Sequence, residues 1–370
     1  MFLLAHRDSG QVGSLLPKAR LHKILHTLVS GVKIQTVPGW TGDLHQSIVG
    51  FPGEFHQFSE LLRAMTTKEL KIEGHFSGHE TFPLRQMWLK KAVEQVESDG
   101  TVSKDTFSDD DAIATFGVGR NMVASIKHWA LACELLREDS TRKHFVLDEI
   151  AREIYRDGGF DPFSEYPTTT WYAHWCLAGR GTRSTTWYWL FNILTAQTFT
   201  RDEVLPILTK FAHSISGGKK LSQATLARDL ETCLRGYAPR SASASIEESA
   251  EPMLAELGLI QEERKGVFSF RRGPKSSLSD AFFAWALVDY WDRLYPGEQS
   301  LTFESVAYAA GSPGRVFKLD EESTAERLFA LSDLTEGKLR WSDTSGLRQI
   351  YRADFDSIRF QKSMMRKSYE

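Results

Sequence analysis

The chain has 370 residues and a formal net charge of −3, with hydrophobic residues at 41%, charged residues at 25% and aromatic residues at 12%. This composition is typical of a folded globular protein and excludes a largely disordered chain. The slightly acidic balance also excludes a protein that coats DNA through an overall positive charge. Any contact with nucleic acid must therefore come from local basic faces. The length predicts two or three domains, or a row of smaller modules.

The cysteines indicate the compartment. Cys133, Cys176 and Cys233 lie far apart and among apolar residues. They contain no CxxC pair and do not form a disulfide framework, so we expect buried free thiols and a reducing environment. No apolar run approaches the roughly 18 residues that a membrane-spanning helix needs, and the first residues do not resemble a signal sequence. We therefore expect a cytoplasmic protein without membrane contact.

The first segment, residues 1–64, differs from the rest of the chain. It is rich in His, Gly and Leu and lacks strong helix caps. Two interpretations stay open. Either Met65 is the native start and the upstream stretch is an over-called extension, or the segment is a small N-terminal appendage.

A first module is predicted over 65–156. A short helix at 112–116, a glycine-bearing turn at 117–119 and a longer helix at 120–131 form the pattern of a helix-turn-helix. Residues 137–144, flanked by short apolar runs, predict a wing. This segment is therefore interpreted as a helix-turn-helix or winged-helix module.

An aromatic-rich helical connector is predicted next, over 157–199. Its Trp and Tyr side chains are expected to form a core that holds the modules together, and a stacking platform for an unpaired base is the alternative. A second winged-helix module is predicted over 200–275. It contains expected helices at 200–213 and 222–235 and a strand–turn–strand pattern at 261–272.

A third, winged-helix-like module is predicted over 276–352. A helix is expected at 320–333, followed by strands at 338–341 and 347–351 that flank a turn. The basic tail 353–370 is expected to fray. The predicted fold class is therefore mainly α, with several winged-helix or helix-turn-helix modules and short β-hairpin wings.

Candidate DNA contacts lie on three predicted surfaces, because Arg and Asn read base edges and Lys meets phosphate. They are Arg120, Asn121, Ser125 and Lys127 on the longer helix of the first module, Arg271 and Arg272 after the second wing, and Arg315 and Lys318 in the third module. The loop 311–315 is also a candidate for binding phosphate through its backbone N–H groups. The alternatives are a helix-turn-helix used as scaffold, a solvated hairpin end and a tight loop before a helix.

The strongest cluster for chemistry lies near position 80. His75 and His79 are four residues apart with Glu80 alongside, which makes all three candidate metal ligands and makes His79 and Glu80 candidate catalytic residues. Two glycines and a proline argue against a regular helix there, so the alternative is a turn that caps the following helix. Mg²⁺ is the cofactor expected if the protein cleaves DNA, although no spacing typical of nucleases is present.

Several dispersed segments resemble a bacterial family, the domain of unknown function family numbered four thousand and seven. The matching segments are Gly78–Arg85, Phe116–Val123, Trp171–Trp175, Gly311–Asp320 and Gly346–Tyr351. Their common order across most of the chain makes the resemblance fairly specific. The first 64 residues are unmatched, and residues 157–163 depart from the family pattern, which puts any role for them in doubt.

The resemblance implies a function. The family is similar to proteins encoded in DNA phosphorothioation clusters, which implies a role in sulfur modification of the DNA backbone and in phage defence. It also implies partners: DNA, a cysteine desulfurase, a sulfurtransferase-type ATP pyrophosphatase and an ATPase. The similar component is the nicking one of the single-strand phosphorothioation system. We therefore predict a DNA-binding component, with metal-dependent nicking and a non-enzymatic adaptor or transcriptional regulator as open alternatives.

Overall fold

The computed structural model describes residues 74–140, 143–217, 221–239, 252–344 and 346–370. The chain divides into two compact units, 1–63 and 64–370, and only the second contains described residues. The predicted extension 1–64 therefore lies outside the described residues. No described helix combines the length and the apolar character needed to cross a membrane.

The first structural repeat consists of two helices joined by a turn and a small sheet. Its elements are β1 (Thr101–Ser103), the 3-10 helix η1 (Asp105–Phe107), α5 (Ala112–Phe116), α6 (Arg120–Ala132), β2 (Leu136–Glu138) and β3 (His144–Leu147). Gly117 ends α5 at a φ of 63°, in the left-handed region that glycine adopts without steric penalty. The turn predicted from the glycines is therefore present between the two helices.

The second repeat follows the same order with longer helices. Its elements are β4 (Thr198–Thr200), α10 (Arg201–Ile215), α11 (Gln223–Tyr237), the 3-10 helix η3 (Met253–Leu257), β5 (Ile260–Arg264) and β6 (Val267–Phe270). A capping box formed by Thr200 and Glu203 starts α10, since each side chain accepts from the other residue's backbone N–H. The predicted strand–turn–strand pattern corresponds to β5 and β6.

The third repeat is β7 (Ser300–Thr302), α13 (Phe303–Ala307), α14 (Pro313–Val316), α15 (Glu321–Leu334), β8 (Leu339–Thr344) and β9 (Leu347–Arg352). Asp320 caps α15 by accepting from the Ser323 backbone N–H at 2.8 Å. The predicted helix and strand pair of this module are thus present within a few residues of their expected ends.

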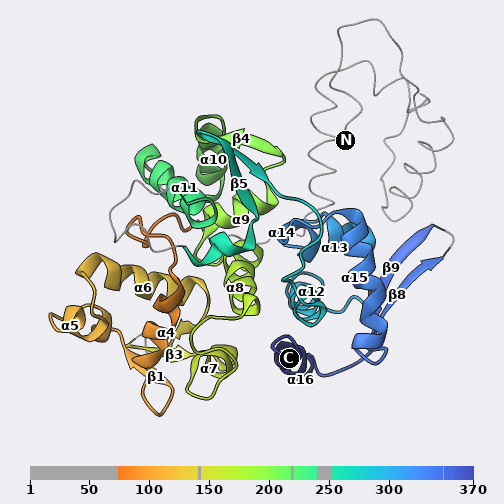
Figure 1. The fold of residues 1–370 in the computed structure, drawn as a ribbon, viewed down its shortest axis with the longest axis horizontal. Coiled ribbons are helices and arrows are strands. Elements are labelled where there is room, and N and C mark those ends of the chain that lie inside the picture. Colours follow the sequence, from red (N-terminus) through yellow and green to blue (C-terminus); the bar gives the residue numbers. More distant parts are fainter. Residues whose placement is uncertain (1–73, 141–142, 218–220, 240–251, 345) are drawn as a thin grey trace, which may run out of the picture. The chain divides into compact units, whose positions relative to one another are not determined.

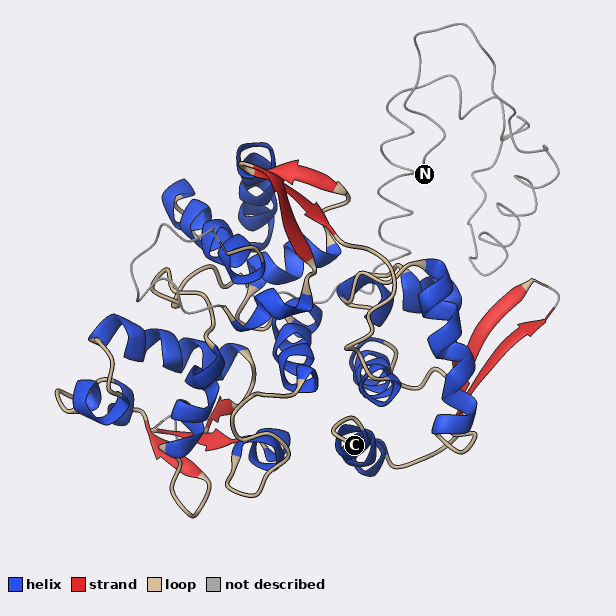
Figure 2. Ribbon diagram, in the orientation of Figure 1, coloured by secondary structure: helices blue, strands red, loops and turns tan. Residues whose placement is uncertain are grey.

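The three repeats share one topology (Figures 1 and 2). In each, a short strand precedes the helices and pairs antiparallel with the last strand of the hairpin, which gives the orders β1-β3-β2, β4-β6-β5 and β7-β9-β8. These sheets correct the predicted fold class, because the protein is mixed α/β rather than mainly α. The leading strands were missed since three residues are too few to show an alternating pattern.

The remaining helices join the repeats and carry an aromatic core. They are α4 (Gln86–Glu94), α7 (Glu149–Tyr155), α8 (Pro167–His174), the π-helix η2 (Trp175–Arg180), α9 (Thr185–Asn192), α12 (Asp280–Leu294) and α16 (Ser357–Lys367). Trp171, Trp175, Trp187 and Trp189 are all at most 1% exposed. The aromatic cluster is therefore core, and the alternative of a stacking platform for an unpaired base is wrong.

The C-terminal segment corrects another prediction. The tail 353–370, expected to fray, contains α16, which packs against α12. Phe360 and Met364 are buried and lie four residues apart, so they share the helix face that meets the core. Thr168 Oγ1 also donates a hydrogen bond to the Ser368 carbonyl oxygen at 2.7 Å. Apolar packing, hidden among basic residues in the sequence, orders this end of the chain.

Candidate nucleic-acid interface

Helix α6 begins with open backbone groups. Its N-cap residue, Gly119, makes no side-chain capping bond, and its first turn contains no acidic residue. The first amide groups of a helix have no partner within the helix and carry a partial positive charge. Arg120 and Asn121 follow directly, and both are exposed. This end of α6 therefore offers cationic and amide donors to a phosphate or to a base edge.

Arg120 is held only loosely. Its Nη2 atom lies 2.9 Å from Asp110 Oδ1, and the two side chains are 64% and 99% exposed. An exposed ion pair of this kind contributes at most about 1 kcal/mol. Arg120 can therefore exchange Asp110 for a DNA group at little cost.

The other two predicted residues of α6 are less accessible. Lys127 is half-buried, whereas Ser125 is fully buried and donates a hydrogen bond to the His79 carbonyl oxygen at 2.7 Å. The prediction that Ser125 lies on the outward face is therefore wrong. It stands four residues before the buried Trp129, on the core side of the helix, where its hydroxyl satisfies a backbone oxygen.

Behind α6, His79 lies in a buried polar cluster. Its Nε2 atom is 2.7 Å from Asp229 Oδ1, and its Nδ1 atom accepts a hydrogen bond from the Thr81 backbone N–H at 3.1 Å. Because Nδ1 accepts, the neutral ring carries its proton on Nε2 and donates it to the carboxylate. Thr186 donates to the other Asp229 oxygen. The cluster thus ties the segment before α4 to α9 and α11.

Two further histidines lie beside this pair. The rings of His75 and His128 stack with centroids 5.7 Å apart. Burial lowers the pKa of His128 well below its ordinary value, and the neighbouring His79 and His75 lower it further. The pKa of His75 is also lowered, first by burial and then by Arg183. Both rings are therefore mainly neutral at pH 7.

Glu80 does not join the histidines. It is exposed, with a φ of 45°. Both ring nitrogens of His79 are engaged, and within the described ranges no group of three or more His, Cys, Asp or Glu side chains is placed to hold a metal ion. The predicted ligands His75, His79 and Glu80 therefore do not form a ready metal centre. Their role in metal binding or catalysis stays a prediction.

Lys318 corrects a predicted DNA contact. It is 3% exposed, and its Nζ atom donates to the Phe191 carbonyl oxygen at 2.7 Å. The same atom lies 4.0 Å from the ring centroid of Phe270. The ammonium group is thus enclosed by a backbone oxygen and aromatic faces, and it does not reach the surface.

The other basic residues of these repeats are accessible to different degrees. Arg271 is exposed and donates to Gln261, and Arg272 is exposed. Arg315 is half-buried, and its Nε atom donates to the Asn192 carbonyl oxygen at 2.6 Å. Each of the three guanidinium groups remains a candidate for contact with an anion.

The loop 311–315 does not offer its amides as predicted. The Gly311 N–H donates to Asn192 Oδ1 at 2.8 Å, and the Ser312 N–H donates to the Ala309 carbonyl oxygen at 3.1 Å. The Arg315 N–H bonds the Ser312 hydroxyl at 3.4 Å. These three groups serve the loop itself, which favours the tight-loop interpretation.

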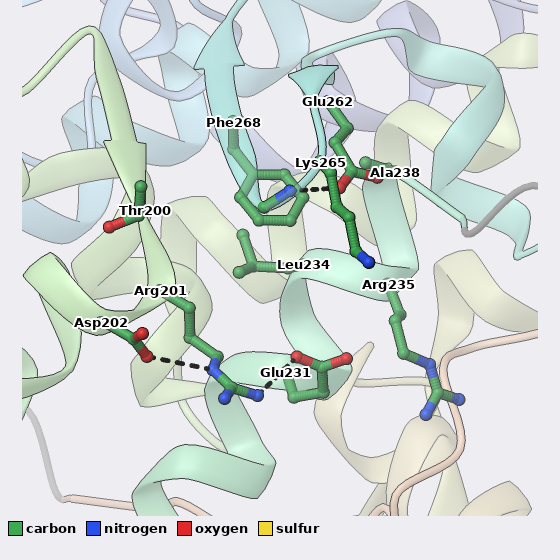
Figure 3. A pocket seen from close by; sticks show the side chains of 11 residues that line it. Thr200, Arg201, Asp202, Glu231, Leu234, Arg235, Ala238, Glu262, Lys265 and Phe268 are labelled. Atoms are coloured by element: carbon green, nitrogen blue, oxygen red, sulfur yellow. Dashed lines mark hydrogen bonds and ion pairs between the residues drawn. The ribbon is translucent and has the colours of Figure 1, made fainter.

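A pocket of about 320 Å³ opens between α10, α11 and the β5–β6 hairpin (Figure 3). Its charged lining residues are Arg201, Asp202, Glu231, Arg235, Glu262 and Lys265. Arg201 lies 3.2 Å from Glu231 and 3.8 Å from Asp202. Because positive and negative side chains are equal in number, the pocket has no net charge to attract a phosphate backbone. We therefore do not include it in the interface.

The comparisons with known proteins cover the part of the chain that contains the three repeats. A family model described as a protein of unknown function, DUF4007, matches residues 76–369. The chain belongs to this family. The match to DUF4007 spans all three repeats, and no curated protein matches the chain.

Two solved structures resemble the DUF4007 chain. One is a crystal structure of magnesium ion-bound SspB, with a TM-score of 0.71 and 25% identity. The other is a crystal structure of SspB, with a TM-score of 0.70 and 26% identity. Each comparison covers 80% of this chain and 88% of the solved chain.

Asp229 of this DUF4007 chain was not predicted as a site residue, although its position among apolar residues could have revealed it. It stands with Leu226, Leu230 and Cys233 on the apolar face of α11. A carboxylate on such a face requires a buried partner. His128 carries no comparable signal, since a histidine on an apolar helix face is common.

Proposed function

We propose that the protein is a DNA-binding component of a bacterial DNA phosphorothioation and phage-defence system, and that it contacts duplex DNA through the start of α6. The observation that carries the proposal is the exposed pair Arg120 and Asn121 at the N-terminus of the second helix of a helix-turn-helix. In proteins of this kind, the N-terminal residues of the second helix contact base edges in the major groove.

The shared topology of the repeats supports a winged-helix interpretation. In the first repeat, the β2–β3 hairpin follows α6 and carries Arg137 and Lys143, both exposed. A helix that enters the groove and a basic hairpin that meets the phosphates would together hold the duplex. The net charge of −3 suits a subunit whose partners share the contact with DNA.

The likeness to SspB supports the assignment to a phosphorothioation system. In this proposal the partners are DNA, a cysteine desulfurase, a sulfurtransferase-type ATP pyrophosphatase and an ATPase. The three buried free thiols fit work in the reducing cytoplasm.

Metal-dependent nicking of DNA is a more specific proposal, and the magnesium ion in one similar structure supports it. The described residues of this chain do not by themselves fit the ion, because none of their His, Cys, Asp and Glu side chains form a suitable group. We therefore propose no reaction step that uses a metal ion held by these residues. The second candidate function is a non-enzymatic adaptor or transcriptional regulator, which the same α6 surface supports.

One assay separates these functions. Supercoiled plasmid is incubated with the full-length protein in Mg²⁺, Mn²⁺ or EDTA, beside a gel shift over a salt series. Open-circle product that requires metal supports nicking, and its loss in a His79→Ala/Glu80→Ala variant that keeps the wild-type melting temperature places the chemistry near position 79. Plasmid that shifts without being cut supports the adaptor. A protein that neither shifts nor nicks DNA overturns the proposed function.

A further inference from the structure

Three cationic side chains meet where the second repeat adjoins the third. The Gly273 N–H donates to the Lys318 carbonyl oxygen at 3.1 Å, which holds the chain leaving β6 against the end of α14 (Figure 1). Arg272 therefore lies beside Arg315 and Lys318, although the two segments are far apart in sequence. Arg272 is exposed, Arg315 is half-buried and Lys318 is buried.

These cations have no carboxylate partner among the described residues. Arg315 and Lys318 donate to backbone oxygens, and the side chain of Arg272 makes no hydrogen bond or ion pair within the described ranges. Burial lowers the pKa of Arg315, and Arg272 lowers it further. The pKa of Lys318 is well below its ordinary value, first through burial and then through the same two arginines. Buried cations in proteins are normally paired with anions, and the half-buried Arg315 donates only to the Asn192 and Tyr308 carbonyl oxygens among the described residues.

The nearest carboxylates in the sequence do not supply that partner. Asp320 accepts from the Ser323 backbone N–H at 2.8 Å, and Glu321 accepts from the Tyr308 hydroxyl. Neither forms an ion pair with Arg272, Arg315 or Lys318 among the described residues.

Further donors flank the cations. Tyr188 is 3% exposed, and burial raises its pKa to about 12, against the opposing effect of Arg293 and Arg315. Its hydroxyl therefore keeps its proton at neutral pH. The Nη2 atom of Arg293 is buried without a hydrogen-bond partner among the described residues. Tyr188 is thus an electrostatic neighbour of Arg315, and the Nε atom of Arg293 is paired with Asp289 at 3.0 Å.

We infer that Arg272 and Arg315 bind a phosphate-type tetrahedral oxyanion, which in the proposed function is a backbone phosphate of DNA. A guanidinium fork matches two phosphate oxygens, and two forks on one phosphate hold it in a fixed position. The assignment to DNA rests on the proposed function, whereas the anion site itself does not.

Binding to a fluorescein-labelled duplex over a salt series tests the assignment. Neutralising one phosphate contributes about 0.9 to the slope of log K against log[salt]. We expect Arg272→Gln/Arg315→Gln to reduce that slope by about 1 and the affinity about tenfold. Arg359→Gln is the matched control, because Arg359 is also exposed but lies on α16, outside the three repeats and the candidate interface. It should leave the affinity within about twofold. Arg272→Gln alone repeats the test at an exposed position where folding is not at risk.

Thermal unfolding in sodium phosphate and in sodium chloride, at equal ionic strength, tests the anion site without DNA. Phosphate stabilises many proteins by exclusion from their surfaces, so the difference between variants is the readout. A larger rise in melting temperature for the wild type and Arg359→Gln than for Arg272→Gln/Arg315→Gln supports the site. Equal rises together with an unchanged salt slope overturn the inference and leave the proposed function standing. A difference in phosphate with an unchanged slope overturns the DNA assignment and supports a site for free phosphate. A wild-type protein that does not bind duplex overturns the proposed function instead.

Discussion

Helices α6 and α15 hold the same place in the first and third repeats but present opposite chemistry. Each is the last helix before its hairpin. Gly119 leaves the start of α6 without a side-chain cap or an acidic residue, whereas Asp320 caps α15 and Glu321 and Glu322 occupy its first turn. The positive end of α15 is therefore neutralised by its own sequence, and that of α6 is open. A shared topology does not imply a shared partner, and the proposed contact of α6 with DNA therefore rests on its charge.

The surroundings of the two helices differ as well. The outward face of α15 exposes Glu322, Glu326 and Asp333, which repel phosphate. Behind α6 lie the three histidines, whereas residues 300–352 contain no histidine. Titration of histidine is therefore expected to act on α6 rather than on β8 and β9, whereas His174 of α8 bonds the Val316 carbonyl oxygen of α14.

The largest effect is expected from a substitution that breaks the buried polar cluster of His79, Asp229 and Thr186 behind α6. Asp229→Ala leaves the His79 Nε2 proton and the Thr186 hydroxyl buried without a partner. We expect the free energy of unfolding to fall by about 3 kcal/mol, measured by urea denaturation. Asp202→Ala, at an exposed carboxylate, should change it by less than about 0.5 kcal/mol. Equal effects would contradict a buried anchor.

The next effect concerns DNA binding by α6. Arg120→Glu/Asn121→Asp replaces two donors with two anions at the open end of the helix. Since a good base contact is worth about 1–3 kcal/mol, the affinity for duplex DNA should fall on the order of 100-fold, measured by fluorescence anisotropy. Unchanged affinity in a correctly folded variant would remove α6 from the interface.

Acid should loosen the first repeat selectively. The pKa of His128 lies below its ordinary value of 6.5 in the folded protein. The stability contribution of this neutral ring is fully present above 6.5 and is lost as the pH falls below it, by about 1.4 kcal/mol per pH unit. Hydrogen exchange, corrected for the intrinsic rate, should show reduced protection of α6 at pH 5.5 relative to pH 7.5, with β8 and β9 unchanged. An equal loss of protection in α6 and in β8 and β9 would contradict a selective effect of acid on the first repeat.

The smallest effect is expected at α15. Glu322→Gln/Glu326→Gln removes two exposed acidic groups from a surface that does not contact DNA in our account. The affinity for duplex should change by no more than about twofold. A tenfold change in the same anisotropy assay would show that α15 faces the DNA.

Elements with a local signal could be predicted from the sequence. The glycines at 117 and 119 marked the turn between α5 and α6, and alternating residues around a turn marked the β5–β6 hairpin. The leading strands β1, β4 and β7 lack such a signal, because each has three residues and pairs with a strand beyond the intervening helices.

The site was predictable only where exposure follows from helix position. Arg120 and Asn121 are exposed, as their place at the start of α6 indicates. Ser125 and Lys318 were misplaced because tertiary contacts, with the His79 carbonyl oxygen and the Phe191 carbonyl oxygen, enclose them. Pairing of His79 with Asp229 joins residues 150 positions apart, and no local pattern encodes such a contact.

Cross-linking from the two equivalent helices tests whether α6, and not α15, lies against DNA. The native cysteines are all buried, so a thiol-reactive benzophenone will label the exposed thiol of Asn121→Cys or Glu326→Cys selectively. Each labelled protein is irradiated with fluorescent duplex DNA at low salt. Our account predicts a protein–DNA adduct from position 121 and only background from position 326. An adduct from position 326 without one from position 121 would contradict it.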